Sequence, residues 1–220
     1  MFQNIGSRWA QIPPVTKNLI IINFLIWVVE IVFPRFSATI VNVLGLHFAW
    51  SDRFNPIQLI TYMFVHDPSS PLHILFNMFT LWMFGRVLEQ VWGPKRFFVF
   101  YMVCGVGAAL VQEGMWAATW RHDYITGIAR MNGMTYDSMR QVVESATAAG
   151  DAGFANAMEM FRSSLVTIGA SGAVFGLLLG FAFVFPDMPL YLFFIPVPVK
   201  AKYMVLGYAC LLYTSDAADE

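Results

Sequence analysis

A single serine stands in an apolar stretch of the chain where its hydroxyl group could do chemistry. Ser171 lies within SLVTIGASGAVFGLLLGFAFVF, residues 164–185, and glycines on both sides leave its hydroxyl uncrowded. A serine hydroxyl becomes a nucleophile when a base takes its proton and hydrogen-bond donors hold the oxyanion that forms. Ser171 is therefore a candidate nucleophile.

The same stretch has an alternative interpretation as a helix-packing surface. Gly172, Gly176 and Gly180 recur at every fourth position. Stripes of small residues let helices approach closely in membranes, and serine is a usual member of them. Taken alone, the stretch favours packing over catalysis, so a nucleophile requires further polar groups nearby.

Two residues in a second apolar run have the required chemistry. His73 and Asn77 occur in HILFN, four residues apart, and so share one face of a helix. Both side chains are costly in a membrane unless they face each other or a water-filled cavity. An imidazole can act as base or donor and a carboxamide can donate a hydrogen bond. By residue type alone, His73 is the candidate base.

The composition places these residues in a membrane protein. The 220 residues are 58% hydrophobic and 12% charged, far from the balance of a soluble domain. With a net charge of −1 and no basic cluster, we expect no nucleic-acid partner. Cys104 and Cys210 lie in apolar runs, as buried cysteines do, and no His-Glu-x-x-His zinc motif occurs. We expect neither a metal nor a cofactor.

Apolar runs predict the helices that would position the three side chains. Four runs are interpreted as transmembrane helices, at residues 19–33, 72–92, 96–111 and 164–185. A fifth run ends at Tyr213 and is shorter than the roughly 20 residues needed to cross a bilayer. The predicted fold is all-α, a polytopic membrane helix bundle.

Basic residues predict how the bundle is oriented. The N-terminal segment and the loops at residues 86–96 and 200–202 carry lysines and arginines, which favours the cytoplasmic side for all three. The starts of the second and fourth helices, with His73, Asn77 and Ser171, then lie on the opposite side. We expect a multi-pass protein of a bacterial cytoplasmic membrane whose site opens to the non-cytoplasmic side.

A polar segment, residues 113–164, separates the third and fourth helices. Its apolar spacing and the breaks at Gly150 and Gly153 predict two short amphipathic helices outside the membrane. Two titratable residues elsewhere are expected at the membrane interface: Glu30 at the end of the first helix and His66 in the loop before the second.

In combination, these motifs resemble the signatures of the rhomboid intramembrane serine proteases. The likeness rests on HILFN, on GASGAVFG, on PVPVKAKY before the fifth helix, and on a spaced pattern formed by Gly85, Glu89, Trp92, Gly93 and Arg96. It covers most of residues 56–208 apart from the polar segment. The resemblance implies a six-helix rhomboid-like bundle, of which about five helices are present.

The resemblance also implies roles for the site residues. Ser171 would be the nucleophile, and His73 and Asn77 would donate to the oxyanion together with the backbone N–H of Ser171. The substrates would be transmembrane proteins, cleaved within the lipid bilayer without a metal. The family base is a histidine on the sixth helix, which these residues lack, so we expect the chain as given to be inactive. The family often has Trp-Arg in its first loop, where this chain has Ile57-Gln58.

Other functions remain as alternatives. A non-catalytic rhomboid-like protein could bind transmembrane clients with the same bundle, although an intact Ser171 argues against it. A small transporter would call for half-helices and an internal repeat, and the sequence shows no repeat.

We predict one membrane domain, residues 1–213, that includes the polar insertion of residues 113–164. The tail, residues 214–220, is expected to be non-native, because LLYTSDAADE resembles translated adapter sequence. The native gene is then expected to continue.

Overall fold

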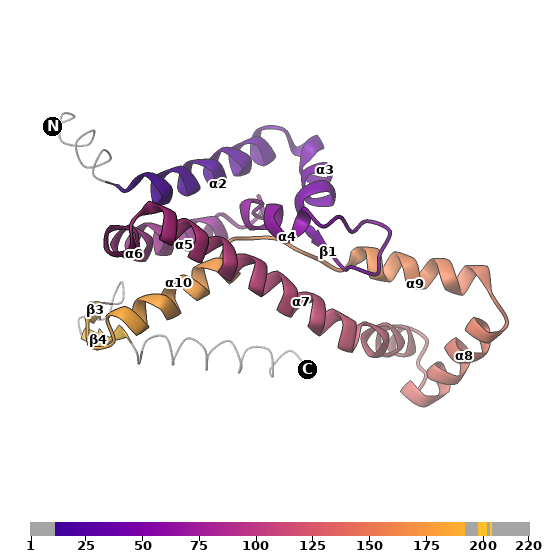
Figure 1. Ribbon diagram of the computed structural model, residues 1–220. Helices are drawn as coiled ribbons and strands as arrows, with labels where there is room; N and C mark the ends of the chain where they lie inside the picture. The colour runs from indigo at the N-terminus through magenta and orange to yellow at the C-terminus, as the bar shows by residue number, and fades with distance from the viewer. Residues whose placement is uncertain (1–11, 192–197, 202, 204–220) are drawn as a thin grey trace. The chain divides into compact units, whose positions relative to one another are not determined.

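The computed structural model describes residues 12–191, 198–201 and 203. These residues are mostly helical, with two short antiparallel ribbons and connecting loops, so the predicted all-α fold class is confirmed (Figure 1). The chain forms two compact units that alternate along the sequence. The first unit is made from residues 1–22, 75–104 and 171–220, and the second from residues 23–74 and 105–170.

The predicted transmembrane runs form helices. They are α2 (Pro14–Val32), α5 (Pro71–Thr80) with α6 (Arg86–Trp92), α7 (Pro94–Met131) and α10 (Ser171–Val184). A π-helical turn, Leu81–Gly85, joins α5 to α6. Among the described helices, α2 and α7 are long and apolar enough to cross a membrane. Strands β3 (Pro189–Tyr191) and β4 (Pro198–Lys200) follow α10 and pair with each other.

The core of the first unit brings α10 against the start of α7. A side chain at Gly180 would collide with the ring of Phe100, and one at Gly176 would collide with Cys104. Phe181, on the same helix, packs edge-to-face on Phe84 with ring centroids 4.8 Å apart. Glycines at every fourth position of α10 therefore lie where α7 comes closest, which is how small residues act in membrane helix packing.

A buried carboxylate holds the N-terminus of α2 in the first unit. Glu89 on α6 is 2% exposed and accepts hydrogen bonds from the N–H groups of Val15 and Thr16, at 2.9 and 2.7 Å, and from the Thr16 hydroxyl, at 2.8 Å. The first N–H groups of a helix have no partner within the helix, and a negative charge there is favourable. Glu89 thus caps α2 from a distant part of the chain.

The second unit holds most of the non-helical backbone. Its elements are α3 (Pro34–Leu44), β1 (Leu46–His47), α4 (Gln58–Thr61), a 3-10 turn (Tyr62–Phe64), α8 (Tyr136–Ala148), α9 (Ala152–Ser164) and β2 (Val166–Thr167). Strand β1 pairs antiparallel with β2, with Leu46 opposite Thr167. This ribbon ties the loop after α3 to the segment that precedes α10.

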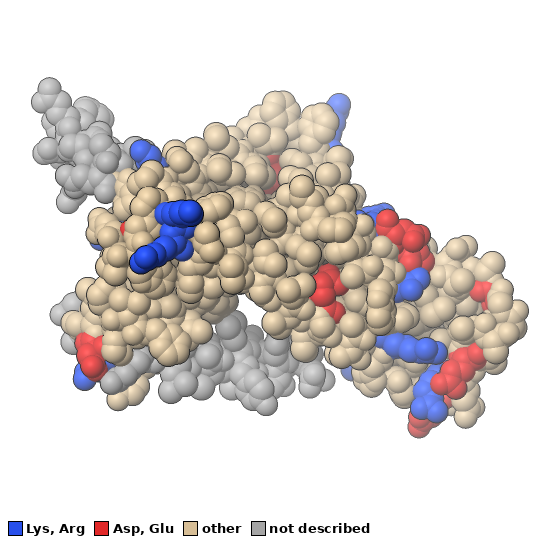
Figure 2. Space-filling model, viewed as in Figure 1, with Lys and Arg blue, Asp and Glu red and all other residues tan. Residues whose placement is uncertain are grey.

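The two amphipathic helices predicted in the polar segment are α8 and α9. They pack on the end of α7 around a core formed by Tyr124, Ile125, Ala129, Met139 and Val143. Charged side chains gather over this part of the second unit (Figure 2). The predicted end of the third helix at Val111 is wrong, because the apolar period continues through Tyr124, Ile125 and Ala129 and keeps α7 helical to Met131. At 38 residues, α7 is about 57 Å long, well beyond a hydrocarbon core of about 30 Å.

Helix α2 has a buried face that carries polar residues. Thr16, Asn23 and Glu30 recur every seven residues on this face and are at most 1% exposed. Beyond Asn18, the exposed side chains of α2 are apolar: Ile21, Ile22, Phe24, Leu25, Val29, Ile31 and Val32. Glu30 is therefore buried against protein, and its expected position at the membrane interface stays a prediction. The fifth apolar run beyond Tyr203 and the tail of residues 214–220 lie outside the described residues.

Replacing Glu89 should loosen the first unit. In Glu89→Gln, an amide NH₂ replaces one acceptor oxygen, so that a buried N–H of α2 loses its partner. We expect the free energy of unfolding to fall by about 2–4 kcal/mol. The control is Glu144→Gln, which removes only an exposed ion pair with Arg140 and should change stability by less than about 1 kcal/mol. Unfolding in mixed micelles measures both, and equal stability of the two variants would contradict the capping role.

Candidate active site

Ser171 is the first residue of α10. The fourth helix was predicted to begin near Ser164 and to carry the serine about two turns inside it. That boundary is wrong, because residues 165–170 are not helical and residues 166–167 form β2. The N–H groups of the first helical turn lack partners within the helix and lie at its positive end. The Ser171 hydroxyl therefore lies beside backbone donors that suit an oxyanion.

The residues just before Ser171 are held by the second unit. Gly169 has φ +116°, a conformation that side-chain-bearing residues rarely adopt, and its N–H donates to the carbonyl of Tyr62 at 2.9 Å. Ala170 is completely buried. The Tyr62 hydroxyl donates in turn to the carbonyl of Gly105 at 2.8 Å. The start of α10 is therefore fixed by hydrogen bonds rather than by helix propensity.

Gln58 anchors the loop before the second transmembrane helix. Its Nε2 donates to the carbonyls of Val43 and Arg53, at 3.4 and 3.1 Å, and its Oε1 accepts from the N–H groups of His47 and Asn55, at 3.3 and 3.1 Å. The side chain is 1% exposed. At the position where the resembling family often has arginine, the carboxamide thus satisfies four backbone groups that would otherwise be unpaired.

His73 and Asn77 lie one turn apart on α5, as the HILFN spacing predicts. Asn77 is 6% exposed and belongs to the first unit with Ser171, whereas His73 is half-buried and belongs to the second unit. The structure brings neither side chain into a described contact with Ser171, and the roles assigned to the three residues stay predictions.

Sequence reasoning missed the position of His66. The residue is fully buried, and its ring centroid lies 5.1 Å from that of His73, so the expectation of an exposed loop histidine is wrong. Burial, together with the nearby His73, lowers the pKa of His66 to about 4, so the ring is neutral at neutral pH. The sequence HDPSS gives no local sign of burial; only the packing of the loop produces it.

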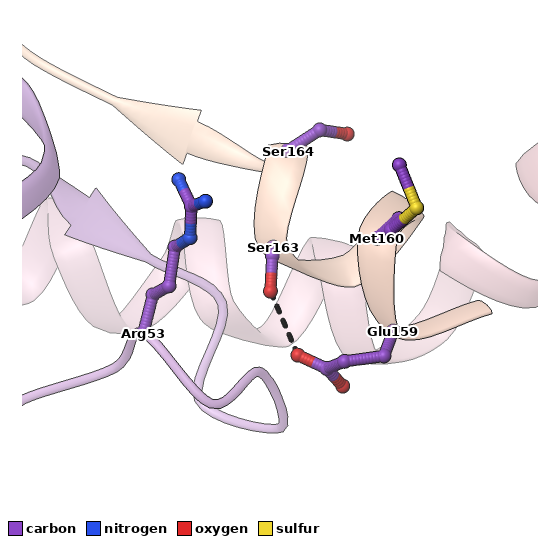
Figure 3. Close-up of a pocket in the computed structure, with 5 residues that line it drawn as sticks. All are labelled: Arg53, Glu159, Met160, Ser163 and Ser164. Carbon is purple, nitrogen blue, oxygen red and sulfur yellow. Dashed lines mark hydrogen bonds between the residues drawn. The ribbon is translucent and has the colours of Figure 1, made fainter. Parts of the chain in front are cut away.

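A separate polar cavity lies between the loop after β1 and α9 within the second unit. It has a volume of about 240 Å³ and is lined by Arg53, Glu159, Met160, Ser163 and Ser164 (Figure 3). Glu159 accepts hydrogen bonds from the N–H of Asp52 at 2.9 Å and from the Ser163 hydroxyl at 2.7 Å. Burial raises the pKa of Glu159, but these bonds and the charge of Arg162 outweigh burial and lower it. The hydrogen bond from the N–H of Asp52 to Glu159 therefore links α9, in the polar segment, to the loop after β1.

No group of three or more metal-ligating side chains occurs in the described part of the chain. The arrangement around Ser171 instead offers a hydroxyl, backbone donors and a helix N-terminus. These groups suit attack on a carbonyl carbon.

Comparison with family models finds a similarity over part of the chain. Residues 53–129 match the family model of the rhomboid domain, which supports membership of the rhomboid family. The matched segment includes His73, Asn77 and Glu89 and ends before Ser171. Neither curated proteins nor solved structures gave a match. Rhomboids are membrane-embedded and form a family of intramembrane proteases, which supports the prediction of an integral membrane protein.

The conformation of Gly169 provides a test of how α10 is started. Gly169→Ala forces a side chain into φ +116° and should lower the free energy of unfolding by about 1–3 kcal/mol. The matched control is Gly127→Ala within α7, where an added methyl group meets no atom within 4 Å and should stabilise the helix by up to about 1 kcal/mol. Thermal unfolding in micelles compares the two. Stabilisation by both substitutions would show that Gly169 is not constrained.

Proposed function

We propose that this rhomboid domain is part of an intramembrane serine endopeptidase in which Ser171 is the nucleophile. The observation that carries the proposal is the start of α10 at Ser171, directly after a segment fixed through Gly169 and β2. A hydroxyl at that point has backbone donors within its own helical turn.

The proposed reaction is acyl transfer. The Oγ of Ser171 attacks the scissile carbonyl carbon while its proton passes to a base, and the carbonyl oxygen becomes an oxyanion. The N–H of Ser171 and the side chains of His73 and Asn77 donate hydrogen bonds to that oxyanion. The base then protonates the leaving amine, and water hydrolyses the acyl-enzyme. We expect the base to be a histidine on a helix outside these 220 residues.

The proposed substrates are transmembrane proteins. A helix in lipid has all its backbone groups hydrogen-bonded, so its carbonyl is not available to a nucleophile until the helix opens. Substrates with helix-breaking residues near the scissile bond should therefore be preferred. We place the opening of the site on the non-cytoplasmic side of a bacterial membrane, following the distribution of lysines and arginines.

Labelling with a fluorophosphonate tests the proposal. The protein from the native gene, including sequence that follows these 220 residues, should label and should cleave a transmembrane reporter. Ser171→Ala should abolish labelling and lower cleavage by about 1,000-fold or more. Ser164→Ala is the matched control, because Ser164 ends α9 and donates its hydroxyl to the carbonyl of Phe161, and it should label fully.

The 220-residue chain alone should not label. Strong labelling of this chain at Ser171 would mean that His73 is the base. A folded native protein that neither labels nor cleaves, but binds transmembrane segments, would contradict the protease and favour a client-binding rhomboid.

A further inference from the structure

A carboxyl group is buried at the end of α2, where the proposed chemistry does not use it. Glu30 is 1% exposed, and both its oxygens are inaccessible. Neither oxygen makes a hydrogen bond of ordinary geometry among the described residues, and the polar groups that act on the carboxyl are the backbone of His66 and the side chain of Asp67. An ionisable group within a membrane helix is expensive, so its retention calls for a function and a partner.

The partner lies in the loop that leads into α5. The backbone of His66 interacts electrostatically with the Glu30 carboxyl, and the ring of His66 packs against that of His73 with centroids 5.1 Å apart and an interplanar angle of 57°. Interactions therefore connect Glu30 on α2 with His66 in the loop, and His66 with His73 on α5. All three belong to the second unit.

The charge of Asp67 also acts on these residues. Asp67 follows His66 and accepts hydrogen bonds from the N–H and the hydroxyl of Ser69, at 2.8 and 2.6 Å. Its carboxylate interacts electrostatically with Glu30 and with His73. These hydrogen bonds lie within the loop and hold the Asp67 carboxylate in place.

We propose that Glu30 and His66 are positioning residues for His73. Glu30 acts on the backbone at His66 from the buried face of α2, and the ring of His66 packs against the His73 ring and fixes its orientation. An oxyanion donor must present its N–H within a few tenths of an ångström of the correct position, which requires neighbours that lock its ring. The effect of this arrangement on catalysis rests on the proposed function. The packing of the three residues does not depend on that function.

Imidazole NMR of the 220-residue chain in lipid nanodiscs tests the arrangement without any need for activity. With ¹⁵N-histidine the chain has only four labelled rings, those of His47, His66, His73 and His122. Glu30→Leu removes the carboxyl group and should shift the ring nitrogens of both His66 and His73. Glu30→Gln keeps an acceptor oxygen and should leave both close to their original positions.

Two further variants separate positioning from general loosening. His66→Phe keeps an aromatic ring but removes its nitrogens, and should shift the His73 ring nitrogens. His73→Asn should raise the titration midpoint of His66, because a nearby ionisable ring that lowers it is removed. His122→Asn is the control: His122 lies on α7, is exposed, and should leave His66 and His73 unchanged.

Unchanged His73 resonances in folded Glu30→Leu and His66→Phe variants would overturn the proposal. So would equal shifts in Glu30→Gln and Glu30→Leu, because the oxygen would then have no role. In the native protein, Glu30→Leu should lower kcat with little change in KM. If that protein is not a protease, the NMR shifts still decide the arrangement, so the two proposals fail separately.

Discussion

A polar group that is buried in lipid is costly unless the protein supplies a hydrogen-bond partner, and two buried side chains show how this constraint shapes the structure. Glu89 accepts three hydrogen bonds and so holds the N-terminus of α2. Gln58 makes four hydrogen bonds and so allows a non-helical loop before α5. Each of these side chains is nearly fully buried, and removing either would leave backbone donors or acceptors without partners. Beyond Asn18, the exposed side chains of α2 are apolar.

The same constraint determines where α10 begins. The segment after α9 is extended, and its backbone is satisfied by β1 and by the carbonyl of Tyr62. Helix α10 starts after this segment, at Ser171. The N–H groups of its first turn and the Ser171 hydroxyl therefore occur at the same end of the helix. The polar segment formed by the end of α7, α8 and α9 leads directly into the segment before Ser171, and Glu159 ties that segment to the loop after β1.

Hydropathy predicted the helices well and their ends poorly. The apolar runs identified α2, α5 with α6, and α10, and HILFN placed His73 and Asn77 on adjacent turns. The start of α10 was missed because Val166 and Ile168 are as apolar as helix residues, and periodicity cannot separate a short strand from a helix. The burial of Glu30 and His66 depends on contacts between α2 and a loop distant in sequence. No local pattern contains that information.

An experimental structure of the native protein with a fluorophosphonate bound tests the central claim most directly. The account predicts a covalent bond from phosphorus to the Oγ of Ser171. The phosphoryl oxygen should lie about 2.7–3.1 Å from the N–H of Ser171 and from side-chain donors of His73 and Asn77. An adduct on another residue, or a phosphoryl oxygen directed away from these three donors, would contradict it.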